Sequence, residues 1–232
     1  MKFVVGIQTC ERLSFLKKCV DSIVKYNPEL MDAYFIIGDD ASKDKRVDEY
    51  INSLDFVDQF IKNKERKGIS ITLKKITESA EKSGDILLYV QNDFFLDRTI
   101  DMASIEAFFQ QYGNAGHIQT MRNKGLKGTN KRFVGTRSYI NGKKTKDFDT
   151  INIGKEQFTL SSRNYCDYPN FTRTKLLHHL WKDFDPNNVA KKAEIPRAKN
   201  FHNICDIYIL ENQPFWNADT SGSRNRTKGR LS

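Results

Sequence analysis

The chain has 232 residues, of which 38% are hydrophobic and 29% are charged, as expected for a soluble globular protein with one substantial core. No apolar run approaches the roughly 18 residues needed to cross a bilayer, and the N-terminal residues lack the cleavage site of a signal peptide. The four cysteines show no metal-binding spacing, so we expect a reduced, cytoplasmic protein.

The net charge of +9 is concentrated in two segments. The segment that begins at Arg122 and ends at Lys146 contains nine basic residues and no acidic one, and the tail at 221–232 adds four basic residues. Such an asymmetry predicts an anionic partner, namely nucleic acid, a membrane surface or an anionic glycan. The alternative is a solvated loop followed by a disordered tail, which would only increase solubility.

Strands and helices are predicted to alternate through the first half of the chain. Apolar runs predict strands at residues 3–8, 34–38, 57–61 and 86–90. The spacing of apolar residues predicts helices at residues 13–24, 45–54, 68–84 and 104–112. This order predicts an α/β fold, with a doubly wound, mostly parallel sheet and helices on both of its faces.

The pattern becomes irregular after His117. We expect strands at 117–121 and 158–162, a loop at 123–146, and helices at 172–181 and 201–211. Four of the five prolines lie in this half. A regular first half followed by a loop-rich half is typical of an enzyme with two substrates. We therefore predict one domain at 1–220, with a nucleotide-binding half at 1–97 and an acceptor half at 98–220.

Acidic residues follow two of the predicted strands. Asp39 and Asp40 come directly after the second strand, and Asn92 and Asp93 come after the fourth. Ligands of open α/β sheets bind beyond the carboxyl ends of the strands, so we expect one polar cleft at this edge. A carboxylate there can hold a hard cation together with a phosphate. The alternative is that Asp93 only starts a loop, and that Asp39, with Ser42 and Asp44, only turns the chain and caps the next helix.

Four motifs stand at strand ends or helix starts. They are VGIQTCER at residues 5–12, GDDASKD at 38–44, KERKGIS at 64–70 and VQND at 90–93. In this order, the motifs resemble those of nucleotide-sugar glycosyltransferases of the GT-A fold, particularly the large inverting family two. The resemblance covers roughly residues 3–97. The second half matches only loosely, in DYPNF at 167–171.

The resemblance implies a nucleotide subsite. The matching positions are Thr9, Arg12, Asp39, Asp40, Arg66, Lys67 and Asn92. In the family, the loop after the first strand and the aspartate after the second hold the base and ribose, which points to Thr9 and Asp40. The basic position before the third helix lies by the base or the diphosphate, which points to Lys67. A carboxylate can accept the imide N–H of uracil, and a helix N-terminus with a lysine suits phosphate oxygens.

The family's metal motif is DxD-like, and this sequence departs from it. Asn92 stands where an acid is common, so Asp93 is the clear carboxylate. Together with diphosphate oxygens and water, it can still hold Mg²⁺ or Mn²⁺, although metal-independent transfer stays open. The resemblance implies a late ligand, for which His202 matches best, and an imidazole would favour Mn²⁺. The alternative for His202 is a histidine on a helix face or the surface.

Inverting sugar transfer needs a base that takes the proton of the acceptor hydroxyl. The family uses an Asp or Glu just before a helix in the acceptor half, which points to Asp167. The neighbouring residues Tyr165 and Tyr168 would be able to stack on a sugar. Asp206 and Glu211 are alternatives, although a helical setting favours a solvated or packed carboxylate at both positions.

The resemblance thus implies a metal-assisted, inverting glycosyltransferase with a UDP-sugar donor and a glycan or lipid-linked glycan as acceptor. One alternative is the same chemistry on a hydroxymethylated base in DNA, with the basic segment on the backbone. A nucleotidyltransferase is another, but such enzymes typically carry a Gly-rich loop after the first strand, and residues 9–12 contain no glycine. A non-catalytic nucleic-acid-binding module would explain the charge but not the acidic strand ends.

Overall fold

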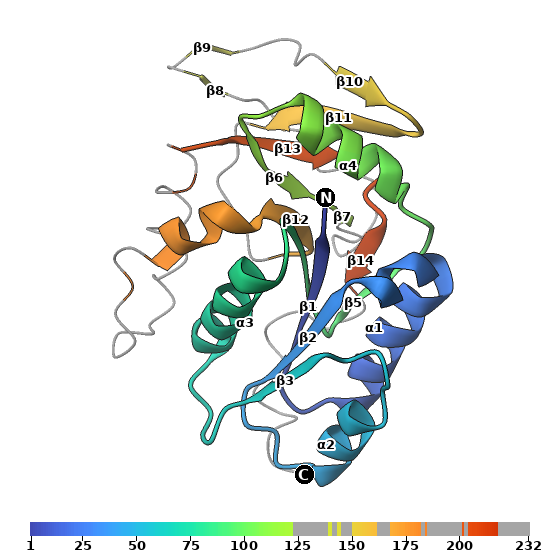
Figure 1. The fold of residues 1–232 in the computed structure, drawn as a ribbon, viewed down its shortest axis with the longest axis vertical. Helices are drawn as coiled ribbons and strands as arrows, with labels where there is room; N and C mark the ends of the chain where they lie inside the picture. The colour runs from blue at the N-terminus through green and yellow to red at the C-terminus, as the bar shows by residue number, and fades with distance from the viewer. Residues whose placement is uncertain are drawn as a thin grey trace.

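The computed structural model describes residues 1–122, 139–140, 143–144, 150–161, 168–181, 184, 201 and 204–217. Its centre is a mixed nine-stranded sheet with the order β10-β11-β13-β6-β12-β4-β1-β2-β3 (Figure 1). These strands are β1 (Phe3–Thr9), β2 (Tyr34–Asp39), β3 (Gln59–Lys62), β4 (Ile86–Gln91), β6 (Ala115–Gln119), β10 (Thr150–Ile153), β11 (Glu156–Ser161), β12 (Asn170–Arg173) and β13 (Asp206–Leu210).

The helices cover both faces of this sheet, as predicted. They are α1 (Leu13–Tyr26), α2 (Lys45–Asn52), α3 (Ile69–Ser83) and α4 (Met102–Gln111), with the 3₁₀ segments η1 (Pro28–Asp32) and η2 (Thr174–Trp181). In Figure 1, α3 lies on one side of the parallel strands, whereas α1 and α2 lie on the other. Among the described residues, no helix has both the length and the apolar composition that a membrane crossing requires.

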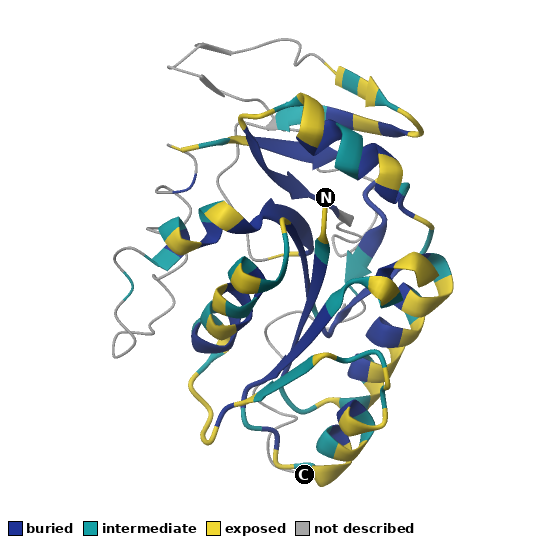
Figure 2. Cartoon of the chain, in the orientation of Figure 1, coloured by how far each residue is buried: buried dark blue, intermediate teal, exposed yellow. Residues whose placement is uncertain are grey.

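The four strands of the first half pair in parallel, and β1, β2 and β4 are buried on both faces, whereas β3 is a half-buried edge strand. Along β4, Ile86, Leu88 and Val90 pack in the cluster that contains α1, α2 and α4. The alternating residues Leu87 and Tyr89 pack with α3 and η2. Figure 2 shows largely buried central strands, an intermediate edge strand β3, and helices whose outer faces are exposed. Burial on both faces explains why these strands are continuous apolar runs in the sequence.

Two glycines allow α3 to lie close to the sheet. A Cβ atom added to Gly6 of β1 would lie 2.6 Å from Ile76 Cγ2, and one added to Gly38 of β2 would lie 2.8 Å from Thr72 Cγ2. Just before the helix, Gly68 has a φ of 89°, a backbone conformation that residues with a side chain rarely adopt. Gly6 and Gly38 therefore let α3 pack closely on the sheet, and Gly68 allows the turn at which α3 begins, at the edge where β1 and β2 end.

The second half continues the same sheet with strands of both directions. β12 is antiparallel to β4 on one side and to β6 on the other, and β13 runs parallel to β6. A smaller sheet contains β5 (Phe94–Leu96), β14 (Phe215–Asn217) and β7 (Met121–Arg122). The two-residue strands β8 (Tyr139–Ile140) and β9 (Lys143–Lys144) are the described part of the predicted loop at 123–146.

One helix prediction in this half is wrong, and another is right only in part. The segment predicted as a helix at 201–211 contains β13, in which four consecutive apolar residues, 207–210, are buried on both faces of the sheet. The segment predicted as a helix at 172–181 begins with the last two residues of β12 and is then helical, as the 3₁₀ segment η2. At β13 and at residues 172–173, a place in the sheet overrides the helical spacing of the apolar residues.

Candidate active site

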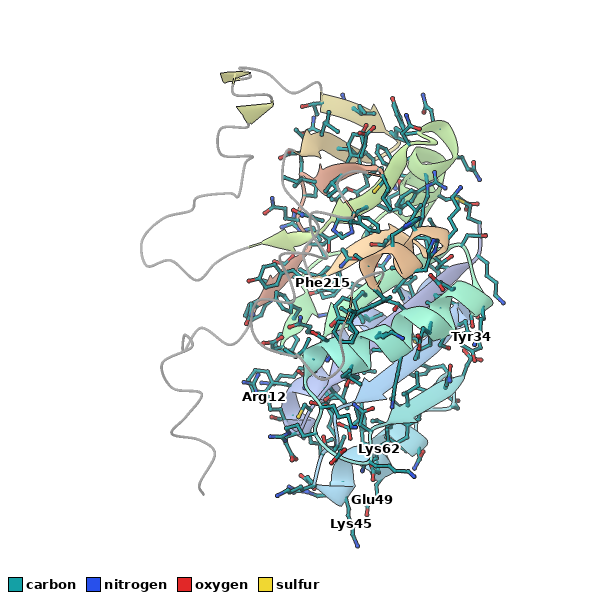
Figure 3. The ribbon with its side chains drawn as sticks, turned by 90° about the vertical axis from the view of Figure 1, so that its left-hand side faces the viewer. Arg12, Tyr34, Lys45, Glu49, Lys62 and Phe215 are labelled. Atoms are coloured by element: carbon teal, nitrogen blue, oxygen red, sulfur yellow. The ribbon has the colours of Figure 1, made fainter. Side chains whose placement is uncertain are left out.

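The candidate site lies at the edge where β1, β2, β3 and β4 end. Backbone hydrogen bonds continue the strand pairing into the loops: Asp40 N–H donates to the Thr9 carbonyl at 3.0 Å, and Asn92 N–H donates to the Gln8 carbonyl at 2.9 Å. Figure 3 shows Arg12, after β1, on one side of the molecule, whereas Tyr34, which begins β2, lies on the other. The loops after four adjacent strands thus meet at one edge.

Asp40 is buried and joins two of these loops. Its Oδ1 accepts hydrogen bonds from the Lys67 N–H at 2.9 Å and from Asn63 Nδ2 at 3.0 Å. Its Oδ2 accepts one from the Gly68 N–H at 2.9 Å. A carboxylate has about four acceptor positions, so three internal bonds leave capacity for a ligand donor. Asp40 therefore fixes the backbone that leads into α3, and its nucleotide contact stays a prediction.

Asp39 shapes the loop in which it lies. Its Oδ2 accepts the Ser42 N–H at 2.9 Å, its Oδ1 accepts the Ser42 hydroxyl, and none of its surface is exposed. Burial raises the pKa of Asp39, while the bonds from Ser42 act in the opposite direction. These contacts match the turn-forming alternative, and the predicted nucleotide contact of Asp39 stays untested.

Glu11 is a residue of this edge that the sequence analysis did not single out. Its Oε1 accepts hydrogen bonds from the Lys43 N–H at 3.0 Å and from Arg66 Nη2 at 3.1 Å. Its own N–H donates to Ser42 Oγ at 2.5 Å. One side chain therefore connects the loops after β1, β2 and β3. Glu11 lies inside the first motif, but nothing in the sequence indicates that its partners are 31 to 55 residues away.

The backbone of these loops is strained. Glu11, Arg12 and Ala41 have φ values of 54°, 60° and 57°, in the left-handed region that favours glycine. Each such residue costs of order 1–3 kcal/mol, and they cluster at ligand sites. Their concentration at this edge, held by the bonds to Glu11 and Asp39, supports the assignment of a functional site.

The ends of β1 and β4 bring four predicted site residues together. Asn92 Nδ2 donates a hydrogen bond to Thr9 Oγ1 at 2.9 Å. Arg12 Nη1 lies 3.7 Å from Asp93 Oδ2, and the Asp93 side chain is only 7% exposed. The Arg12 guanidinium also lies 5.2 Å from the centre of the Phe15 ring, within the range of a cation–π contact. A buried carboxylate is thus held beside a half-exposed cation.

Lys67 takes part in the site mainly through its backbone. Its N–H bonds to Asp40, whereas its exposed side chain lies 3.0 Å from Glu65 Oε1. An exposed ion pair of this kind contributes little stability, so the ammonium group can turn toward a phosphate at small cost. The predicted role of Lys67 at the base or diphosphate stays a prediction.

A divalent cation at this edge would need ligands beyond the side chains that the structure describes. Within the part of the chain that the structure describes, no group of three or more His, Cys, Asp or Glu side chains is placed to hold a metal ion. Asp93, at the end of β4, supplies hard oxygen donors of the kind that Mg²⁺ and Mn²⁺ prefer. The donor set therefore fits a cation that is shared with a diphosphate. His202 lies outside the described residues.

The predicted base, Asp167, also lies outside the described residues, as does Tyr165. The next residue, Tyr168, is 46% exposed, and β12 begins two residues later at Asn170. Because β12 is antiparallel to β4, its first residues lie at the edge where β4 ends. The start of β12, three residues after Asp167 in the sequence, therefore lies at the edge of the candidate site.

The position of Asp206 argues against it as an alternative catalytic base. Asp206 is the first residue of β13, a strand that has the same direction as β6 and therefore as β4. It thus lies at the amino ends of these strands, on the opposite edge from Asp93, and it is not in a helix. Glu211 directly follows β13 and is likewise not helical; its N–H bonds to the Gln157 carbonyl at 2.9 Å.

Comparison with solved structures identifies the fold, whereas no protein-family model and no curated protein matches the sequence. The structure of residues 1–349 of TarS from S. aureus matches with a TM-score of 0.65 at 13% identity, covering 94% of this chain and 60% of that chain. The same protein in complex with UDP has a TM-score of 0.62 at 16% identity, covering 93% of this chain and 60% of that chain. GalNAc-T7 with UDP, GalNAc and Mn²⁺ has a TM-score of 0.63 at 14% identity, covering 94% of this chain and 44% of that chain.

The chain has a GT-A-type glycosyltransferase fold. This confirms the fold predicted from the sequence. Identities this low show the fold alone, and the chain spans 60% or less of each of these neighbours. The activity of a GT-A protein must therefore be argued from its own site.

Proposed function

We propose that this protein is a glycosyltransferase that moves a sugar from a UDP-sugar to an acceptor hydroxyl. The observation that carries the proposal is the gathering of Thr9, Arg12, Asp40, Asn92 and Asp93 at the carboxyl edge of adjacent strands in a GT-A fold. Two of the structural neighbours support the choice of donor, because they are TarS with UDP-GlcNAc and GalNAc-T7 with UDP.

The donor would lie across the ends of β1, β2 and β4. Thr9 and Asp40 are proposed to hold the nucleoside, with the remaining acceptor capacity of Asp40 directed to the imide N–H of uracil. The diphosphate would lie between the Lys67 side chain, the N-terminus of α3 and Arg12. A helix N-terminus carries partial positive charge and unpaired backbone N–H groups, both of which stabilise phosphate oxygens.

Transfer with inversion would follow from the two halves of the site. Asp167 is the proposed base, which takes the proton of the acceptor hydroxyl while that oxygen bonds to the anomeric carbon and the bond to the diphosphate breaks. A Mn²⁺ or Mg²⁺ ion held by Asp93, with His202 as a second ligand, would stabilise the charge of the departing diphosphate. Arg12 lies beside Asp93 and adds a fixed positive charge at the same place.

Thermal-shift and calorimetric titrations with nucleotides test the proposal directly. UDP and UDP-sugars should raise the melting temperature, with a larger shift in the presence of Mn²⁺. A ligand at 100 times its Kd contributes about 2.7 kcal/mol of stability, which is easily measured. Asp40→Ala should abolish the shift, whereas Asp32→Ala should not, because Asp32 ends η1 just before β2 begins at the opposite edge.

The reaction products distinguish sugar transfer from nucleotidyl transfer. A glycosyltransferase releases UDP, whereas a nucleotidyltransferase releases or consumes pyrophosphate. Release of UDP from a UDP-sugar in the presence of acceptors supports sugar transfer. If no nucleotide shifts the melting temperature with or without Mn²⁺, the protein is not a nucleotide-sugar enzyme.

A further inference from the structure

The side chain of Asn63 has a place in this site that the sequence motifs do not indicate. Asn63 directly follows β3 and is 3% exposed. Its backbone N–H donates to the Asp39 carbonyl at 2.9 Å, which extends the pairing of β2 and β3 by one residue. The strand register thereby directs the buried amide toward Asp40 and α3.

All hydrogen-bonding groups of this amide are used. Asn63 Nδ2 donates to Asp40 Oδ1 at 3.0 Å and to Thr72 Oγ1 at 2.9 Å, and Lys75 Nζ donates to Asn63 Oδ1 at 2.6 Å. An ammonium group can only donate and a carboxylate can only accept, so these two partners fix the orientation of the amide. A polarised chain of hydrogen bonds therefore runs from Lys75 through Asn63 to Asp40. We call these three side chains the Asn63 relay.

We propose that Asn63 is a positioning residue for the nucleotide site and acts through Asp40. Asp40 accepts the N–H groups of Lys67 and Gly68, which are the last residues before α3. By holding the Asp40 carboxylate in one rotamer, the Asn63 relay sets the backbone at the N-terminus of α3. The inference rests on the proposed function, because that N-terminus is the proposed diphosphate subsite.

Substitution of Lys75 tests the relay with little risk to folding, since Lys75 is exposed on α3. Lys75→Met should raise the Kd for UDP about tenfold, which corresponds to the loss of one charge-assisted hydrogen bond. Lys75→Arg, which keeps a charged donor, should restore most of the affinity. Lys74→Met is the matched control, because the neighbouring Lys74 pairs with Glu78 on the surface of α3.

Asn63→Asp tests the relay through the pH dependence of UDP affinity, which a merely structural role of Asn63 would not change. It places a second carboxyl group about 3.0 Å from Asp40. At low pH, the pair can share a proton and keep the geometry, whereas at higher pH the two negative charges repel. The affinity of this variant for UDP should therefore fall at least tenfold relative to wild type between pH 5 and pH 8. The wild-type profile is the reference, because wild-type protein has the same titratable and charged groups around Asp40, namely Asp39, Cys10, Lys67 and Lys75.

The outcomes separate this inference from the proposed function. If wild-type protein binds UDP and both Lys75→Met and Asn63→Asp bind it equally well at every pH, the positioning role is overturned. If Lys75→Met lowers only the melting temperature and leaves the Kd unchanged, the relay is structural and the inference is likewise overturned. If wild-type protein binds no nucleotide, the proposed function fails, and the positioning role fails with it.

Discussion

Tyr168 packs against Phe94, with ring centroids 5.7 Å apart. Phe94 follows Asp93 in the sequence, and Tyr168 follows Asp167. The contact therefore joins the chain next to the predicted base to the chain next to the predicted metal ligand. It is the structural reason for testing these two carboxylates as parts of one site.

Asp167→Asn should leave nucleotide binding unchanged and lower sugar transfer. Loss of a general base typically costs 10²- to 10⁴-fold in rate, because an amide cannot accept the hydroxyl proton. Calorimetry with UDP and a UDP-release assay measure the two effects separately. If Glu211→Gln shows this signature and Asp167→Asn does not, the base has been assigned to the wrong residue.

Asp93→Asn should remove activity and any increase in UDP affinity caused by Mn²⁺. The amide keeps the size of the side chain but loses the negative charge that a cation requires. Asp97→Asn is the control, because Asp97 follows β5 and pairs with the neighbouring Arg98 at 3.2 Å. Turnover of Asp93→Asn at the wild-type rate would show that Asp93 is not a metal ligand.

The basic segment should determine the salt dependence of acceptor binding. Simultaneous substitution of Lys143, Lys144 and Lys146 by Glu should weaken binding of an anionic acceptor without changing the thermal shift by UDP. On duplex DNA, the logarithm of the affinity should fall with the logarithm of salt concentration with a slope of about −0.9 per phosphate contact. Mobility-shift titrations at two salt concentrations measure this slope. Absence of DNA binding at low salt would eliminate the DNA-modifying alternative.

His117 should make stability depend on pH. It is fully buried, its Nδ1 is 2.7 Å from Thr172 Oγ1, and burial lowers its pKa to about 3. Below pH 6.5, the unfolded chain binds a proton here that the folded protein does not bind. His117 therefore makes the free energy of unfolding decrease by up to about 1.4 kcal/mol per pH unit as the pH falls from 6.5 toward 3. Urea denaturation between pH 7 and pH 4 should show a shallower dependence for His117→Gln; an unchanged slope would contradict this assignment.

Arg173 should be a major contributor to stability. Its guanidinium donates hydrogen bonds to the Ala115 carbonyl at 2.7 Å, to the Tyr112 carbonyl at 3.2 Å and to the Phe109 carbonyl, so it caps the C-terminus of α4. Arg173→Met should lower the free energy of unfolding by about 2 to 4 kcal/mol, because hydrogen bonds to charged groups are lost and buried carbonyls are left unpaired. Arg98→Met, at the surface, is the control. An equal effect of both substitutions would contradict the capping role.

The first half of the fold was predictable because β1, β2 and β4 are buried on both faces and amphipathic helices alternate with the strands. β13 was missed for a physical reason. Phe201, Ile204, Cys205 and Tyr208 have the spacing of one helix face, and only the pairing with β6 and β11 selects a strand. Pairing between segments about 50 to 90 residues apart leaves no local pattern in the sequence.

The candidate site was predictable to a similar extent. Asp40, Asn92 and Asp93 could be found because they directly follow apolar strands. Glu11 and Asn63 could not be found, because their importance depends on backbone groups and side chains of other loops. The prediction for Asp39 included both a ligand contact and a turn, and its contacts with Ser42 are those of a turn.

The insertion of β12 between β4 and β6 has a consequence for dissecting the protein. A fragment of residues 1–97 would contain all four sequence motifs of the proposed nucleotide site but would expose the edge of β4 that β12 covers. An unpaired, apolar edge strand is a template for self-association. Such a fragment should aggregate when expressed alone, so donor recognition cannot be isolated by truncation. The polypeptide must be synthesised at least to residue 173 before β4 gains its second neighbour.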